Sequence, residues 1–132
     1  MSFNRVITHP AAGYIEVIFE GHEDWMSAVD TIEKIAAMID QYGVYRVVLD
    51  FSRVDMRVAV AEAPQVAKFF HAFSNHELSF GVIRSHDGRA DPTIDAFVEN
   101  MRTLGHGAEY LESRAATENW ASRQSKSARR AG

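Results

Sequence analysis

Side chains able to take part in recognition or catalysis gather directly after an apolar run in the middle of the chain. They are two carboxylates, one hydroxyl and two guanidinium groups, contributed by Asp50, Ser52, Arg53, Asp55 and Arg57. Asp50 and Asp55 have no evident partner that would divide them into an acid and a base, so we expect them to cap turns. The following residues, Met56 to Glu62, contain no serine, threonine, cysteine or histidine. The segment therefore favours recognition over catalysis.

Two interpretations of Arg53 and Arg57 are open. Both precede a predicted helix, whose unpaired amides and dipole favour an anion, so the two guanidinium groups could hold a phosphate or a carboxylate. Alternatively, they are exposed and pair with Asp50 or Asp55, each pair contributing at most about 1 kcal/mol. Either way, the turn predicted from Asp50 to Arg57 is the candidate recognition surface.

Other catalytic and metal-binding patterns are absent from the sequence. There is no cysteine, which excludes thiolate catalysis, disulfides and cysteine-ligated metals. Of the six histidines, His71 and His76 are five residues apart, a spacing that does not align two side chains on a helix. We expect the histidines to be solvated or to cap helices. Since no glycine-rich phosphate loop or nucleophile elbow occurs either, we predict no enzyme activity, no metal and no cofactor.

Composition limits the class of protein and its partners. Hydrophobic residues make up 46% of the 132, but no apolar run approaches the roughly 20 residues of a membrane helix. The first residues lack the apolar core of a signal peptide, so we expect a cytoplasmic, bacterial-type protein without membrane insertion. Met1 to Ser122 carries ten cationic and 18 acidic side chains, a net charge of −8 that argues against nucleic acid. Residues 123–132 form a basic segment that we expect to be a disordered tail.

The apolar spacing alternates between strand and helix. Predicted strands cover Arg5 to Thr8, Tyr14 to Glu20, Val47 to Phe51, Leu78 to Ile83 and Ala108 to Leu111. Predicted helices run from Trp25 to Gly43, from Pro64 to Phe73 with its phenylalanines in the core, from an N-cap at Asp91 to Leu104, and onward from Ser113. The order β-β-α-β-α-β-α-β-α predicts one α/β domain over residues 1–122, with a mostly parallel sheet that an antiparallel hairpin opens.

This order and several short motifs resemble the STAS domains, in particular the small bacterial SpoIIAA-like proteins, whose fold is shared in outline with the lipid-binding Sec14 (CRAL-TRIO) group. The motifs are Leu49-Asp-Phe-Ser52, Phe80-Gly-Val-Ile83, and Tyr110-Leu-Glu-Ser113 followed by Glu118-Asn-Trp120. In anti-sigma-factor antagonists of the STAS type, a serine at the start of the helix after such a strand is phosphorylated. The matching positions here, Val58 to Ala61, offer no hydroxyl, and Arg53 replaces the glycine usual after Ser52.

What the resemblance implies is therefore the fold and a surface for protein contacts, without the phosphorylation switch. We expect a non-enzymatic regulatory module that binds a protein partner or itself, and the richly apolar strands favour a homodimer. The alternative is a Sec14-like carrier of a small apolar or anionic ligand, for which Phe69, Phe70, Phe73 and Phe80 would supply an apolar lining.

Overall fold

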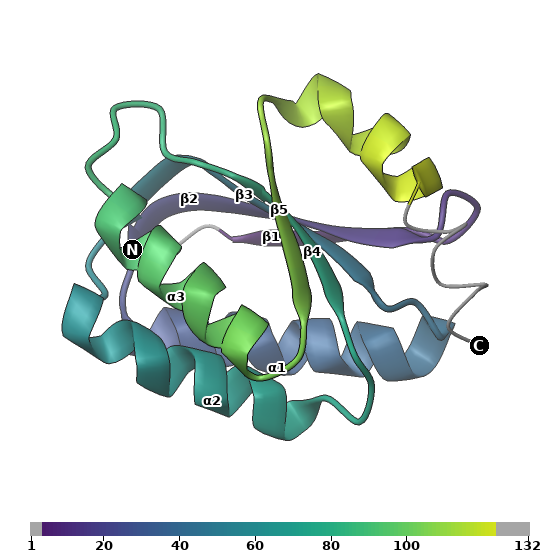
Figure 1. The fold of residues 1–132 in the computed structure, drawn as a ribbon, viewed down its shortest axis with the longest axis horizontal. Helices are drawn as coiled ribbons and strands as arrows, with labels where there is room; N and C mark the ends of the chain where they lie inside the picture. Colours follow the sequence, from purple (N-terminus) through teal and green to yellow (C-terminus); the bar gives the residue numbers. More distant parts are fainter. Residues whose placement is uncertain (1–3, 124–132) are drawn as a thin grey trace.

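A computed structural model describes residues 4–123 and gives an α/β domain with five strands (Figure 1). The strands are β1 (Arg5–His9), β2 (Tyr14–Glu23), β3 (Arg46–Met56), β4 (Ser79–Ile83) and β5 (Gly107–Leu111). The α-helices are α1 (Trp25–Tyr42), α2 (Ala63–Phe73) and α3 (Asp91–Thr103), with short 3₁₀ turns η1 (Val60–Glu62) and η2 (Arg114–Ala116). Residues 117–123 continue η2 as a last helical segment. The expected tail, apart from Arg123, lies outside the described residues.

The strands lie in the sheet in their sequence order. β1 and β2 are antiparallel, while β2, β3, β4 and β5 are parallel neighbours. The register across the centre runs from Ile18 through Asp50 to Ile83. This arrangement confirms the predicted parallel sheet with an opening hairpin, and it places β3 in the middle.

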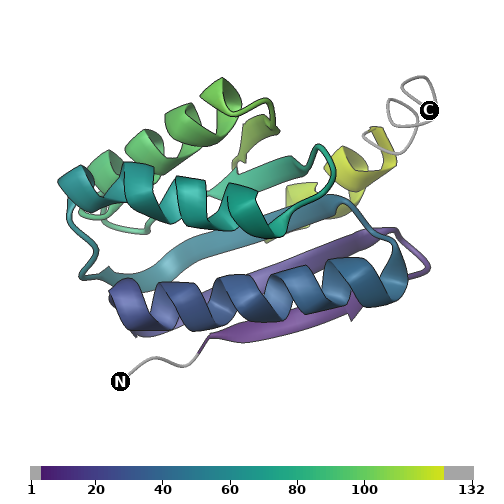
Figure 2. The ribbon, with the colours of Figure 1, turned by 90° about the horizontal axis from the view of Figure 1, so that it is seen from below.

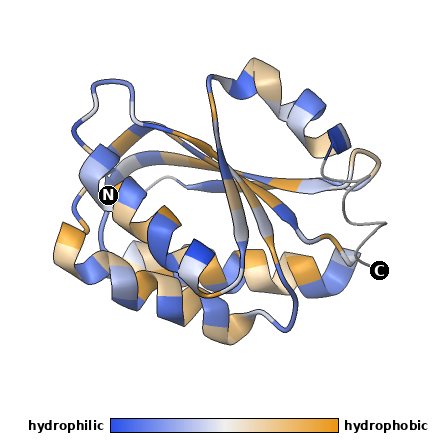
Figure 3. Ribbon diagram, viewed as in Figure 1, coloured by the Kyte–Doolittle hydropathy of each residue, from blue (hydrophilic) through white to orange (hydrophobic). Residues whose placement is uncertain are grey.

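Three helices cover the same face of the sheet, which we call the helix face. Figure 2, seen from below, shows α1, α2 and α3 in front of the strands, because each parallel crossover turns in the same sense. The main core fills this layer, and strand residues of one parity contribute to it: Ile15, Val17 and Phe19 from β2, and Val47, Leu49 and Phe51 from β3. Figure 3 shows apolar residues interrupted by polar ones along the strands, and helices on which apolar and polar residues alternate.

Opposite lies the open face of the sheet, where Figure 1 shows the helical segment that follows β5. A smaller core forms there between the sheet and that segment, from Tyr14, Val48, Ile83, Leu111, Trp120 and Ala121. Gly81 makes the close approach of Trp120 possible. A Cβ atom at Gly81 would lie 2.8 Å from Leu111 Cδ1 and 3.2 Å from the Trp120 ring.

Local signals set the ends of the helices. Asp24 and Ser27 form a capping box at the start of α1, with Asp24 Oδ1 accepting from the Ser27 amide at 2.9 Å. Gly43 ends α1 in the left-handed conformation, with φ of 64°. Pro64 lies in the first turn of α2, as predicted. No helix of residues 4–123 is long and apolar enough to cross a membrane.

Three local predictions are wrong. The expected turn from Asp50 to Arg57 is strand as far as Met56, because β3 of 11 residues pairs with β2 of 10 residues up to that position. Asp91 does not cap α3: it lies in the first turn, and its carboxylate accepts from the Ser85 amide and hydroxyl instead. Phe73, expected in the core, is 43% exposed at the end of α2, whereas Phe70 is buried.

Candidate recognition surface and strand-end groove

A β-bulge determines where the predicted recognition residues point. The pairing of β2 with β3 shifts by one residue between Ile18–Asp50 and Glu20–Arg53. After this shift Val54 and Met56 pack against the main core. Because side chains alternate along a strand, Arg53 and Asp55 point to the open face. Arg53 and Asp55 are both exposed there. They lie directly across from Glu20 and His22 of β2.

Asp50 differs from the other predicted residues because its side chain is buried. It is only 2% exposed, and its Oδ1 accepts from the Ser52 amide at 3.0 Å and from the Ser52 hydroxyl at 2.6 Å. Ser52 itself is half-buried. The expected hydrogen bond of Ser52 is confirmed, although it forms within a strand and not in a turn. Asp50 therefore supports the backbone of β3 and has little surface to offer a partner.

Asp55 forms a charged cluster with Arg57 and His22. Arg57 Nη2 donates to Asp55 Oδ2 at 2.8 Å, and His22 Nε2 lies 3.0 Å from the same oxygen. The hydrogen bond from Arg57 lowers the pKa of Asp55 below its usual value. Of the two interpretations of Arg57, the structure thus shows the pairing with Asp55. No ion pair involves Arg53 among the described residues.

The connection from β3 to α2 carries no group able to accept a phosphate. Val58 is buried, and its carbonyl oxygen accepts from the Thr93 hydroxyl at 3.0 Å. The Ala59 amide donates to Glu62 Oε1 at 2.9 Å, which closes the η1 turn. Five residues, Val58 to Glu62, separate Arg57 from the first residue of α2. The two arginines therefore do not flank the first turn of that helix, contrary to the anion-binding hypothesis.

The sequence did not predict a groove of about 590 Å³ at the carboxyl ends of β3, β4 and β5, which we call the strand-end groove. Its lining includes Ser52, Ile83, Arg84, Ser85, His86, Tyr110, Leu111, Glu112, Ser113 and Arg114. Open α/β sheets bind ligands at this end of their strands. The signal that could have found it is the polar triplet after each of the last two strands, Arg84 to His86 and Glu112 to Arg114.

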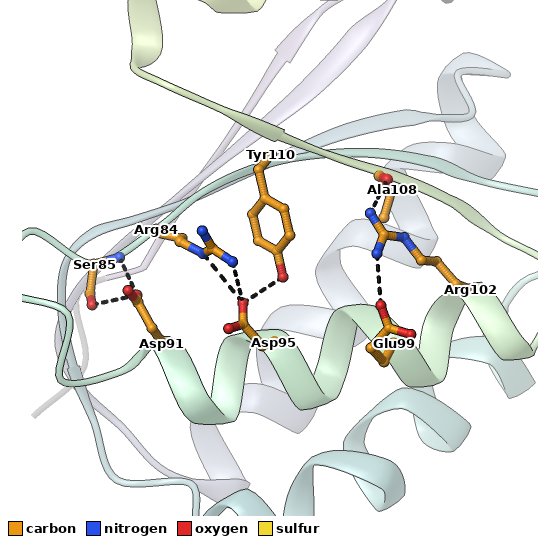
Figure 4. A network of polar contacts seen from close by, with 8 residues as sticks. All are labelled: Arg84, Ser85, Asp91, Asp95, Glu99, Arg102, Ala108 and Tyr110. Carbon is orange, nitrogen blue, oxygen red and sulfur yellow. Dashed lines mark hydrogen bonds and ion pairs between the residues drawn. The ribbon is translucent and has the colours of Figure 1, made fainter.

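A polar network orients Arg84 at the edge of this groove (Figure 4). Its guanidinium lies 3.9 Å from the centre of the Tyr110 ring and donates through Nη2 to Asp95 Oδ1 at 2.9 Å. The Tyr110 hydroxyl donates to the same oxygen at 2.6 Å. Burial and the Asp95 carboxylate together raise the pKa of Tyr110 to about 12. Tyr110 therefore stays a neutral donor at physiological pH, and Arg84 lies between a ring and a carboxylate.

A buried carboxylate orients Arg114 in a comparable way. Glu16, on the open face, is 4% exposed. Its Oε2 lies 2.7 Å from Arg114 Nε, and its Oε1 lies 3.0 Å from His9 Nε2. The His9 ring stacks on Tyr14 with 4.5 Å between centres. Arg114 thus reaches over the open face and lies between the strand-end groove and a second groove of about 460 Å³ beside His9.

An apolar cavity of about 60 Å³ lies between the helices and the helix face of the sheet. Its walls include Phe19, Phe51, Phe70 and Phe97, and Glu23 also lines it. The Glu23 carboxylate accepts from Asn4 Nδ2 at 2.9 Å and from the Ser27 hydroxyl. Burial raises the pKa of Glu23 above its usual value. This volume is well below the roughly 300 Å³ at which pockets for small ligands begin.

The histidines do not assemble a metal site. Within residues 4–123, no three histidine, aspartate or glutamate side chains gather as metal ligands. His71 Nδ1 and His106 Nε2 are nevertheless 2.9 Å apart, a contact between residues too distant in the sequence to be predicted. His106 is 6% exposed, so the expectation that every histidine is solvated or capping is wrong for this residue.

Comparison with known proteins identifies the fold. No protein-family model matches the sequence, and no curated protein does. The structure is similar to that of the anti-sigma factor antagonist SpoIIAA in its unphosphorylated form, with a TM-score of 0.50 over 90% of this chain and 96% of that chain. The chain has the SpoIIAA-like fold. Sequence identity over the match is 13%, so the likeness extends to the fold and its element order. The resemblance expected from the motifs is thereby confirmed at the level of the fold.

Proposed function

We propose that this SpoIIAA-like chain is a non-enzymatic STAS-like regulatory module that binds a protein partner. The binding surface is the end of β3 together with the residue after it, formed by the half-buried Ser52 and the exposed Arg53, Asp55 and Arg57, which we call the β3 surface. The main support for this proposal is the bulge in β3, which turns Arg53 and Asp55 toward the open face. Neither side chain packs in the main core. Charged side chains exposed on a rigid strand suit electrostatic recognition of a partner.

A phosphorylation switch at the start of α2 has no place in this proposal. Neither Val58 to Ala61 nor Glu62 carries a hydroxyl, and the Glu62 carboxylate already binds the free amide of Ala59. Incubation with host lysate and ATP, followed by peptide mapping, should find no phosphate between Arg57 and Phe73. Stoichiometric phosphate on Ser52 would contradict this view of regulation.

The β3 surface is tested by the double change Arg53→Ala and Arg57→Ala. Both side chains are exposed, so we expect each change to alter the free energy of unfolding by less than about 0.5 kcal/mol. Tagged protein should lose the partners that wild type retains from host lysate, as quantified by mass spectrometry. The matched control, Arg89→Ala with Arg102→Ala, removes the same charge from exposed positions elsewhere and should retain them. A sharp drop in melting temperature with unaltered binding would show that the two arginines are structural.

Self-association is a further part of the proposal. The C-terminal segment packs on the open face through Trp120 and Ala121, while Ile7 on β1 remains 36% exposed. A sheet edge of this kind needs a cover, and pairing of two copies provides one. Light scattering at micromolar concentration should give the mass of a dimer. A strictly monomeric mass at every concentration would remove this part of the proposal and leave the heterologous partner.

The apolar-carrier alternative is weaker. A carrier needs a pocket for its cargo, and the cavity between helices and sheet measures about 60 Å³. Native mass spectrometry of protein purified from its own host separates the two functions, because a carrier would retain an apolar molecule. An anionic ligand requires a different site.

A further inference from the structure

Two arginines line the strand-end groove: Arg84 directly follows β4, and Arg114 begins η2 after β5. Each guanidinium group pairs with a carboxylate. Arg84 donates to Asp95 through Nε and Nη2, and Arg114 pairs with Glu16 through Nε. Neither carboxylate lines the groove, whereas both arginines do. Among the described residues, Nη1 of Arg84 and both terminal nitrogens of Arg114 have no hydrogen-bond acceptor.

The remaining lining has the chemistry of an oxyanion site. Ser113 brings a hydroxyl and His86 an imidazole, and Glu112 is the one acidic residue of the lining. The hydroxyls of Ser52 and Ser85 already donate to Asp50 and Asp91, so the two arginines carry the recognition of the anion. Guanidinium groups oriented in advance lose less entropy on binding, and they match the geometry of phosphate oxygens. We propose that the strand-end groove binds a small soluble phosphate monoester, with Arg84 and Arg114 as its phosphate ligands.

The size of the groove favours an ester over free phosphate. About 590 Å³ lies within the range of small-molecule sites and exceeds what one phosphate group fills. Ile83, Leu111 and the Tyr110 ring offer apolar contacts for the remainder of such a molecule. This inference goes beyond the proposed function, because the binding needs no protein partner and is measured without one.

The first experiment is an NMR titration of the full chain with glycerol 3-phosphate and with inorganic phosphate, at low and matched ionic strength. We expect amide shifts around residues 84–86 and 112–114, a dissociation constant below about 10 mM for the ester, and weaker binding of inorganic phosphate. Arg84→Gln and Arg114→Gln should each weaken binding about tenfold. Arg102→Gln is the control, because Arg102 is also exposed and paired, with Glu99, but does not line the groove.

Glu112→Gln keeps the proposal testable even if an arginine variant fails to fold. Glu112 is exposed and has no ion pair among the described residues, so the change should leave the fold intact and tighten binding by removing a negative charge. Absence of shifts at the groove up to about 10 mM would overturn the proposal. Equal losses in Arg102→Gln and Arg84→Gln, or a Glu112→Gln variant that binds no tighter, would do so too. If the protein sediments with phosphatidic acid vesicles but does not bind the soluble ester, the proposed soluble ligand is wrong. The groove would then bind the phosphate of a lipid headgroup.

Discussion

His106 Nε2 lies 2.9 Å from His71 Nδ1, and the neighbouring backbone determines which of the two nitrogens carries the proton. The Leu78 amide donates to His106 Nδ1 at 2.9 Å, so Nδ1 is an acceptor and the proton of neutral His106 is on Nε2. His106 therefore donates to His71. A second proton on His106 would sit on Nδ1 and face the Leu78 amide, which is also a donor, so this hydrogen bond requires a neutral His106.

This pair predicts a loss of stability in mild acid. Burial, and after it the proximity of His71, lowers the pKa of His106 below its ordinary value of about 6.5. The unfolded chain then takes up the proton at a higher pH than the folded chain. The stabilising contribution is present above about pH 6.5 and is lost as the pH falls through that value toward the lower folded-state pKa.

The measurement is urea unfolding between pH 8 and pH 5 for wild type and His106→Asn. The asparagine can still accept from the Leu78 amide but does not titrate, so its free energy of unfolding should depend less steeply on pH below about 6.5. His76→Asn changes an exposed histidine and should keep the wild-type slope. Equal slopes for His106→Asn and wild type would show that the histidine pair is not linked to folding.

Glu23 should destabilise the folded protein as the pH rises above the ordinary glutamate pKa. Its pKa is raised by burial, so the folded chain holds the proton to a higher pH than the unfolded chain. That contribution to stability is complete below the ordinary glutamate pKa and is lost as the pH rises through the raised value. We expect Glu23→Gln to gain stability relative to wild type at pH 8 and not at pH 4. Glu20→Gln, at a more exposed position, should show no such difference.

Two substitutions of Asp50 distinguish a structural role of this residue from a role in partner binding. Asp50→Asn keeps an acceptor for the Ser52 amide, whereas Asp50→Ala leaves this half-buried donor without one. We expect Asp50→Ala to cost about 1–3 kcal/mol in the free energy of unfolding and Asp50→Asn less. Partner retention should persist in Asp50→Asn, because the side chain is buried. Loss of partners in a stable Asp50→Asn variant would place Asp50 in the binding site after all.

The element order could be predicted from the sequence because periodicity and caps agree with tertiary packing. Gly43 and Pro64 mark helix ends by local backbone preference, which requires no knowledge of distant residues. The end of β3 could not be predicted in this way. From Arg53 to Met56, polar and apolar residues alternate because one side of the strand faces the open face. Beyond Phe51 the strand therefore lacks the continuous apolar run by which it is recognised.

Contacts between distant segments explain the parts of the candidate sites that sequence reasoning missed. His71 and His106 are 35 residues apart, and only the packing of α2 beside the start of β5 brings them together. Arg114 similarly reaches Glu16 from the opposite end of the chain. The strand-end groove follows from sheet order, which places the residues after β4 beside those after β5. Side-chain types alone could not reveal these neighbours.

Gly81 provides the sharpest test of how the open face is packed. A Cβ atom there would meet Leu111 Cδ1 at 2.8 Å and the Trp120 ring at 3.2 Å, so Gly81→Ala must displace the C-terminal segment or strain β4. Overpacking of this kind costs about 1–3 kcal/mol in the free energy of unfolding. Gly107→Ala is the control, because the nearest atom to its Cβ would be Ser79 Oγ at 3.7 Å, an ordinary contact.

Chemical denaturation with tryptophan fluorescence measures both effects, since Trp120 is fully buried in this contact. We expect Gly81→Ala to lower the unfolding midpoint and shift the emission of the native state to longer wavelength, as Trp120 becomes exposed. Gly107→Ala should change neither by more than a small amount. If Gly81→Ala had wild-type stability and emission, the packing of Trp120 on β4 would be wrong. The position of Arg114 over the open face, and with it one wall of the strand-end groove, would then need revision.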